Sequence, residues 1–113
     1  MRKAMEPIQV IGGELLDDTE KAITNDLMKE YYPKITRQLK NITSITVHVK
    51  AHSKGGKRKK YDIRVKAIAP TRPFEAQESD WDLARTLHRV FRNIIREIQH
   101  KFRTDSQHKK SHG

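Results

Sequence analysis

Hydrophobic residues recur with a helical period in residues 81–103, which read WDLARTLHRVFRNIIREIQHKFR. Their spacing is i, i+3, i+4, i+7, so at about 100° per residue they gather on one side of a helix. Asp80 or Asp82 can cap the N-terminus, where a carboxylate also suits the helix dipole. The pattern therefore predicts an amphipathic helix with one core-forming face. Its apolar stripe consists of Leu83, Leu87, Val90, Phe91, Ile94 and Ile98.

Two segments in the middle of the chain alternate between apolar and polar residues, as half-buried strands do. They are SITVHVKA at 44–51 and KYDIRVKAIA at 60–69, and the HSKGGKRKK stretch at 52–60 predicts a hairpin connection with two glycines. Shorter stretches, PIQVI at 7–11 and FEAQE at 74–78, predict a first and a last strand. The residues expected to face inward are Ile45, Val47, Val49, Tyr61, Ile63, Val65 and Ala67.

A second helix is expected to start at Asp17 or Asp18, where an Asp cap precedes a polar first turn. Pro33 interrupts its pattern, because proline lacks the amide that a helix interior uses. We expect a kink there, or a break after which Pro33 opens a second short helix. The apolar positions are Ala22, Ile23, Leu27, Tyr31, Ile35 and Leu39.

The predicted order of elements is β-α-β-β-β-α. It corresponds to an α+β fold, a four-stranded sheet with two helices packed on one face. With 113 residues the chain is expected to form one domain over residues 7–103, after a flexible leader at 1–6. Residues 104–113 have no apolar anchor, so we expect them to form a disordered basic tail.

The charge of the chain points to a polyanionic partner. Lys and Arg number 24 against 14 Asp and Glu, a formal net charge of +10. Residues 1–30 hold seven acids and four bases, whereas residues 50–66 hold eight bases and one acid, Asp62. Such a basic patch favours nucleic acid first and an anionic membrane surface second. The apolar helix stripe is of core size, so we expect no membrane partner.

Three groups of basic side chains are the candidate RNA-binding residues. The side of the 81–103 helix opposite its apolar stripe carries an arginine row, and guanidinium groups bind phosphate in a bidentate manner. Asp82 can pair with Arg85, but no acid lies three or four residues before Arg89, Arg92 or Arg96. The alternative is an ordinary solvated helix face. The three groups are expected to form one composite surface. They are the helix residues Arg85, Arg89, Arg92, Arg96, Lys101 and Arg103, the hairpin residues Lys54, Lys57, Arg58, Lys59 and Lys60, and the strand residues Lys50, Arg64 and Lys66.

Signatures of catalysis and metal binding are weak. The chain has no cysteine, and His48 and His52 on one strand face are roughly 13 Å apart, too far to share a metal. Residues 55–57 lack the spacing of a phosphate loop. We therefore expect no enzyme activity, cofactor, metal or small-molecule substrate. A metal-dependent nuclease remains an alternative, because Glu75, Glu78 and Asp80 lie close in sequence.

Trp81 precedes the helix stripe, so we expect it to pack as a lid on the core. Stacking of a nucleobase on it, or on a tyrosine, is the less favoured interpretation. The N-terminus lacks the apolar run of a signal peptide, and no segment has the length of a membrane span. A cytoplasmic location is expected.

The order of elements and the last helix resemble the ribosome hibernation-promoting factors, also called ribosome-associated inhibitors. The similarity lies in IQVIGG, SITVHVKA, KYDIRVKAIA, FEAQE, and Asp82 with the apolar stripe, over about residues 7–103. It implies binding to the small ribosomal subunit and its rRNA, in the channel used by messenger and transfer RNA, to inhibit translation in resting or stressed cells. The contacts it implies are Arg89, Arg92, Arg96, Lys101, Arg103, Lys50, Arg64 and Lys66.

Two features depart from that family, Pro33 and the strongly basic hairpin at 54–60. We also see no second domain of the kind that pairs ribosomes in long members. We therefore expect a short or divergent member. A double-stranded RNA-binding module is the nearest alternative. Such modules place bases at the start of their last helix, where this chain has Asp80-Trp81-Asp82.

Overall fold

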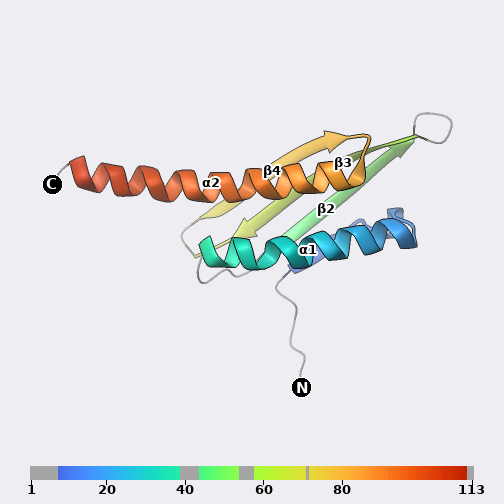
Figure 1. Cartoon of the computed structure of the whole chain (residues 1–113), viewed down its shortest axis with the longest axis horizontal. Helices are drawn as coiled ribbons and strands as arrows, with labels where there is room; N and C mark the ends of the chain where they lie inside the picture. Colours follow the sequence, from blue (N-terminus) through green and yellow to red (C-terminus); the bar gives the residue numbers. More distant parts are fainter. Residues whose placement is uncertain (1–7, 39–43, 54–57, 71, 112–113) are drawn as a thin grey trace, which may run out of the picture.

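Two helices lie on one face of a four-stranded sheet, which confirms the predicted α+β fold (Figure 1). The computed structural model describes residues 8–38, 44–53, 58–70 and 72–111, of which residues 102–111 are described as backbone only. The strands are β1 Ile8–Ile11, β2 Ser44–Ser53, β3 Lys59–Ile68 and β4 Pro73–Asp80. The helices are α1 Asp18–Gln38 and α2 Leu83–Ser111, with a 3-10 turn, η1, at Gly13–Leu15.

The strands lie side by side in chain order, β1-β2-β3-β4. β1 pairs with β2 in parallel, because the chain returns through α1 before it forms β2. The β2–β3 and β3–β4 pairs are antiparallel, as hairpin connections require. In this register Val10, Val47, Val65 and Ala76 lie in one row across the sheet. β1 and β4 are therefore the two edges.

The core lies between the sheet and the helices, and it contains the residues that the alternation predicts. Every strand position expected to face inward is buried, and the α2 stripe is at most 6% exposed. Tyr31 stacks on Phe91 at 5.1 Å between ring centroids, which joins α1 to α2. Within the described ranges, neither helix is apolar enough over a sufficient length to cross a membrane.

Of the two alternatives predicted at Pro33, a kink or a break, the break is wrong, because α1 continues through this residue to Gln38. A proline removes one intrahelical hydrogen bond, and buried Tyr31 and Ile35 anchor the helix on either side of it. Ala22 is exposed, and Thr24 takes the core position instead. The Thr24 hydroxyl can be buried because it donates to the Glu20 carbonyl at 2.9 Å. Leu39 lies outside the described residues.

Two elements extend further than their sequence patterns predict. β4 includes Asp80, which therefore belongs to a strand and not to the start of the helix. α2 continues to Ser111, into the segment expected to be a tail. Residues 104–111 contain neither Pro nor Gly, so no helix-breaking residue ends α2 at Arg103. The predicted leader at 1–6 and residues 112–113 lie outside the described part.

Candidate nucleic-acid interface

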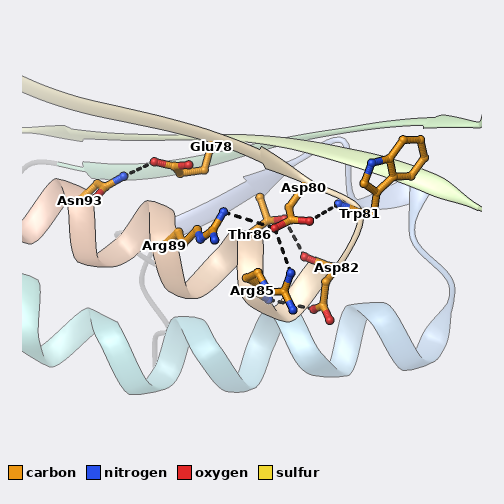
Figure 2. A network of polar contacts seen from close by, with 8 residues as sticks. All are labelled: Glu78, Asp80, Trp81, Asp82, Arg85, Thr86, Arg89 and Asn93. Atoms are coloured by element: carbon orange, nitrogen blue, oxygen red, sulfur yellow. Dashed lines mark hydrogen bonds and ion pairs between the residues drawn. The ribbon is translucent and has the colours of Figure 1, made fainter.

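The start of α2 is fixed by Asp82, one of the two predicted caps (Figure 2). Its carboxylate accepts a hydrogen bond from the Arg85 amide at 2.9 Å. Its carbonyl accepts from the Thr86 amide at 3.0 Å and from the Thr86 hydroxyl at 2.7 Å. The Arg85 amide is one that a helix start leaves unpaired, and the Thr86 amide makes the first backbone hydrogen bond of the helix. Asp82 thus fixes where α2 begins.

Asp80 does not cap the helix, because it binds two arginines of α2 from the end of β4 (Figure 2). Its carboxylate lies 3.6 Å from Arg85 and 3.3 Å from Arg89, and it accepts the Trp81 amide at 2.6 Å. The Trp81 amide, and then Arg85 and Arg89, hold the pKa of Asp80 below its usual value. The prediction that Asp82 pairs with the Arg85 side chain, and the inference that Arg89 lacks an acidic partner, are therefore wrong.

The arginines of these two ion pairs remain available to a phosphate. Their side chains are 58% exposed at Arg85 and 53% exposed at Arg89. Asp80 itself is only 15% exposed, so a phosphate can approach each guanidinium group from its solvent side. Arg85 and Arg89 can therefore both orient the β4–α2 turn and bind an anion.

Arg92 and Arg96 lie farther along α2, beside a groove between the two helices. The groove has a volume of about 400 Å³, and Lys34 from α1 also lines it. Neither arginine has an ion-pair partner among the residues that the structure describes. Glu30 is the one acid that lines the groove, and it pairs with Lys34 at 3.7 Å. The groove therefore carries net positive charge.

A tyrosine and a histidine form one wall of this groove. The Tyr31 hydroxyl and His88 Nδ1 lie 2.7 Å apart, in a hydrogen bond that links α1 to α2. The Lys34 ammonium lies 5.0 Å from the centre of the Tyr31 ring. Lys34 is a candidate that the sequence does not indicate, because its proximity to Arg92 and Arg96 arises only when the helices pack.

The second basic surface is the face of the sheet that the helices leave open. Lys50, Lys60 and Lys66 extend from this face, following the outward positions of β2 and β3. Arg64 is also there, but it is engaged: Nε lies 3.5 Å from Glu75, and the guanidinium donates to Gln77 at 3.3 Å. A small hollow of about 90 Å³ lies among His48, Lys50, Asp62, Arg64 and Gln77.

The three hairpin residues in the described part, Arg58, Lys59 and Lys60, have different surroundings. Lys59 points toward the helices, where its ammonium lies 3.1 Å from the Glu20 carboxylate, so its placement in an RNA-binding loop is not supported. Arg58 lies over the Trp81 ring at 4.6 Å. Trp81 is 40% exposed and is not a lid on the core. Lys54 and Lys57 lie outside the described residues, as does the side chain of Arg103; Lys101 is half-buried on α2.

Glu20 joins α1 to the start of β3. Its carboxylate accepts from the Asp17 amide at 2.9 Å while Asp17 accepts from the Glu20 amide at 2.8 Å, a reciprocal capping box. It also accepts from the Tyr61 hydroxyl. Burial acts to raise the pKa of Glu20, but the hydrogen bonds from Tyr61, Asp17 and Lys59 outweigh it and lower the pKa. Burial, and then Glu20, raise the pKa of Tyr61 to about 12.

The two basic surfaces lie on opposite sides of the molecule. The α2 stripe packs on the inner face of the sheet, so the arginines behind the stripe point away from it. The lysines of β2 and β3 extend from the outer face. The expectation of one composite surface is therefore wrong. The sequence predicts which side of each element is basic, but the layering decides how those sides combine.

The carboxylates considered for a nuclease do not assemble. Glu75 lies on the open face with Arg64, whereas Glu78 and Asp80 lie on the helix side with Asn93 and the α2 arginines. Among the described residues, no three His, Asp or Glu side chains are grouped so that they could hold a metal ion.

Solved structures of other proteins share this fold, and two of them are compared with this chain. One is a ribosomal subunit interface protein from Coxiella burnetii, with a TM-score of 0.54 and 13% identity over 86% of this chain and 94% of that chain. The other is the N-terminal domain of Thermus thermophilus Protein Y, with a TM-score of 0.51 and 13% identity over 82% of this chain and 93% of that chain. No protein-family model and no curated protein matches the sequence. At this identity the likeness establishes the fold.

Proposed function

We propose that this protein binds the small ribosomal subunit through its rRNA, in the channel used by messenger and transfer RNA, and thereby inhibits translation. The observation that carries the proposal is the pair of basic surfaces on opposite sides of one thin domain. A channel walled by RNA offers phosphate on both sides of such a domain. An RNA helix bound from one side would contact only one of the surfaces.

The fold supports the same proposal. One protein of this fold is named for the interface of ribosomal subunits. The proposed binding unit is residues 7–103, acting in the cytoplasm as a stoichiometric inhibitor without cofactor or catalysis. On this proposal Arg92, Arg96 and Lys34 bind one wall of the channel, and Lys50, Lys60 and Lys66 bind the other.

The double-stranded RNA-binding alternative fits less well. β1 adds a parallel strand to the sheet, which the α-β-β-β-α order of that module lacks. Asp80, at the end of β4, and Asp82, the cap of α2, lie just before the helix, and these carboxylates repel phosphate at the helix end that the module uses. The nuclease alternative requires a carboxylate cluster that the described residues do not form.

Sedimentation of purified small subunits with the protein, at increasing salt, tests the proposal. Each phosphate contact contributes roughly 0.7 to 0.9 to the slope of log affinity against log salt. The double variants Arg92→Ala with Arg96→Ala, and Lys50→Ala with Lys66→Ala, should each weaken binding and flatten that slope by about 1 to 2. Lys21→Ala with Lys29→Ala is the control, since it removes the same charge from the exposed side of α1, away from both surfaces.

The outcomes separate the proposal from its alternatives. Protein that stays in the ribosome-free fraction at low salt contradicts ribosome binding. Loss of binding in only one of the two test variants contradicts a position between two RNA walls. Competition by a plain RNA duplex as strong as that by small subunits supports the double-stranded RNA-binding module, and magnesium-dependent cleavage of RNA supports the nuclease.

A further inference from the structure

The single tryptophan of the chain lies on the surface, beside the end of the open sheet face. Tryptophan is largely buried in most proteins, but Trp81 is 40% exposed. Its amide donates to the Asp80 carboxylate at 2.6 Å, which fixes the backbone from which the side chain extends. Figure 2 shows the indole pointing away from α2. The ring is therefore presented to solvent from a turn that the hydrogen bond to Asp80 holds.

A guanidinium already lies on this ring. The Arg58 guanidinium carbon is 4.6 Å from the ring centre, in cation–π range. Arg58 comes just before β3 and Trp81 just after β4, so the contact links the open ends of two neighbouring strands. Planar groups of this kind are the ones on which unpaired RNA bases stack.

One further cation, Lys60, lies beside the pair, because Tyr61 is opposite Asp80 in the sheet and Lys60 and Trp81 are their chain neighbours. Lys60 is exposed at the start of β3, and its partner across the sheet is His52 on β2. A base stacked at Trp81 would bring its phosphate toward Lys60, whose charge has to offset the flanking Asp80 and Asp82 carboxylates. Stacking supplies about 1–3 kcal/mol per base, and it tolerates any base because each has a flat face.

A protein partner fits this site less well. The other exposed large apolar residues in the described part are Ile11, Leu15 and Ile68. Ile11 and Leu15 are at the β1 side of the sheet, and Ile68 is at the opposite end of β3 from Lys60. Trp81 thus has charged rather than apolar surroundings, whereas protein contacts are centred on buried apolar groups.

We propose that Trp81 and Arg58 form a stacking site for one unpaired nucleobase, with Lys60 binding its phosphate. This proposal rests on the proposed function, because it takes RNA as the ligand. It adds a requirement that phosphate contacts alone do not impose, namely that the bound RNA has an unpaired base at this end of the sheet.

The chain carries its own reporter for this site, because Trp81 is its only tryptophan. Single-stranded oligoadenylate should quench the fluorescence of the protein in a saturable manner, as the base stacks on the indole. Inorganic polyphosphate at the same phosphate concentration carries charge without bases, and it should leave the emission nearly unchanged. No quenching by oligoadenylate, or equal quenching by polyphosphate, would overturn the proposal.

Variants test the same site by a second measurement, the anisotropy of a labelled oligoadenylate. Trp81→Ala should weaken binding about tenfold, Trp81→Phe less, and Arg58→Lys should weaken it while keeping the charge. The exposed position of Trp81 predicts an unchanged melting curve. Equal affinity of Trp81→Ala and the parent protein contradicts a stacking site.

These measurements use free oligonucleotide, so they are independent of the ribosome. Quenching without sedimentation on small subunits would reject the proposed function and keep the stacking site. Sedimentation without quenching would reject the stacking site and keep the proposed function.

Discussion

Gly12 is constrained by both its backbone and its neighbour. Its φ is 90°, in the left-handed region that side chains rarely adopt. A Cβ at this position would overlap the carbonyl oxygen of Val49 on β2. Gly12 follows β1 and begins the turn that leads to α1, so this close approach keeps the turn against the sheet.

Gly12→Ala should lower the free energy of unfolding by about 1–3 kcal/mol from backbone strain alone. The overlap with Val49 should lower it further. Urea unfolding followed by circular dichroism measures the change. Gly13→Ala is the matched control, since its Cβ would meet only the Val10 side chain, at an ordinary 3.6 Å. Equal effects of the two substitutions would contradict the constraint at Gly12.

The contact between the Tyr61 hydroxyl and the Glu20 carboxylate can be followed by titration. The pKa of Tyr61 is about 12, against an ordinary value of 10.0. The folded state favours the protonated phenol, because burial and the Glu20 carboxylate both oppose the phenolate. Its contribution to stability is therefore fully present below pH 10 and is lost as the pH rises through about 12.

We expect Tyr61→Phe to be less stable than the parent at neutral pH by roughly 1.5–3 kcal/mol, the range for a hydrogen bond to a charged group. The difference should shrink as the pH rises from 10 toward 12. Spectrophotometric titration of phenolate, parent minus variant, gives the pKa of Tyr61 directly. A midpoint near 10 would show that the Glu20 contact does not form in solution.

Residue pairings divide into those that local spacing predicts and those that the fold creates. The Asp82 cap follows from its position before the apolar stripe, and the structure confirms it. The pairing of Asp80 with Arg89 cannot be predicted in this way, because β4 extends past its apolar residues and carries Asp80 alongside α2. The exposure of Trp81 is a consequence of the same extension.

At the scale of elements, the repeat of hydrophobic positions predicts whether a segment is a helix or a strand. It does not predict where the segment ends, because the residues at the ends are polar and outside the repeat. Alternation predicts β2 and β3, and their inward residues are buried. The ends of β4 and α2 lie among polar residues, where pairing and helix propagation continue without an apolar signal. At Pro33 the sequence instead favours an end to the helix, but α1 continues because its packing outweighs that local preference.

Pro33→Ala should therefore stabilise the protein by about 1–3 kcal/mol, since it restores an amide to an uninterrupted helix and loses only the stiffness of proline in the unfolded chain. Thermal unfolding measures the gain. Asp26→Ala, at another exposed position of α1 that already has its amide, should change stability by less. A loss of stability in Pro33→Ala would instead show that the ring packs in the groove that it lines with Ile8 and Tyr32.

At the scale of the whole molecule, the charge pattern of each element is predictable, but its partners are not. The arginine side of α2 and the lysine side of β2 and β3 are both evident in the sequence. Their opposition across the sheet follows from the placement of both helices on one face. The groove that brings Lys34 beside Arg92 and Arg96 also depends on that packing.

The parallel pairing of β1 implies an order in which the molecule assembles. Short connections join β2, β3, β4 and α2. In contrast, α1 lies between β1 and β2 in the chain, so Ile8 can pair with Ile45 only when this long connection closes. Closing the longer loop costs more chain entropy, so β1 should add last and open first. We expect the amides that pair β1 with β2 to exchange with deuterium faster than those between β2 and β3. Each opening would expose β2 as a temporary edge, so β1 protects the chain from joining strands with another copy of itself.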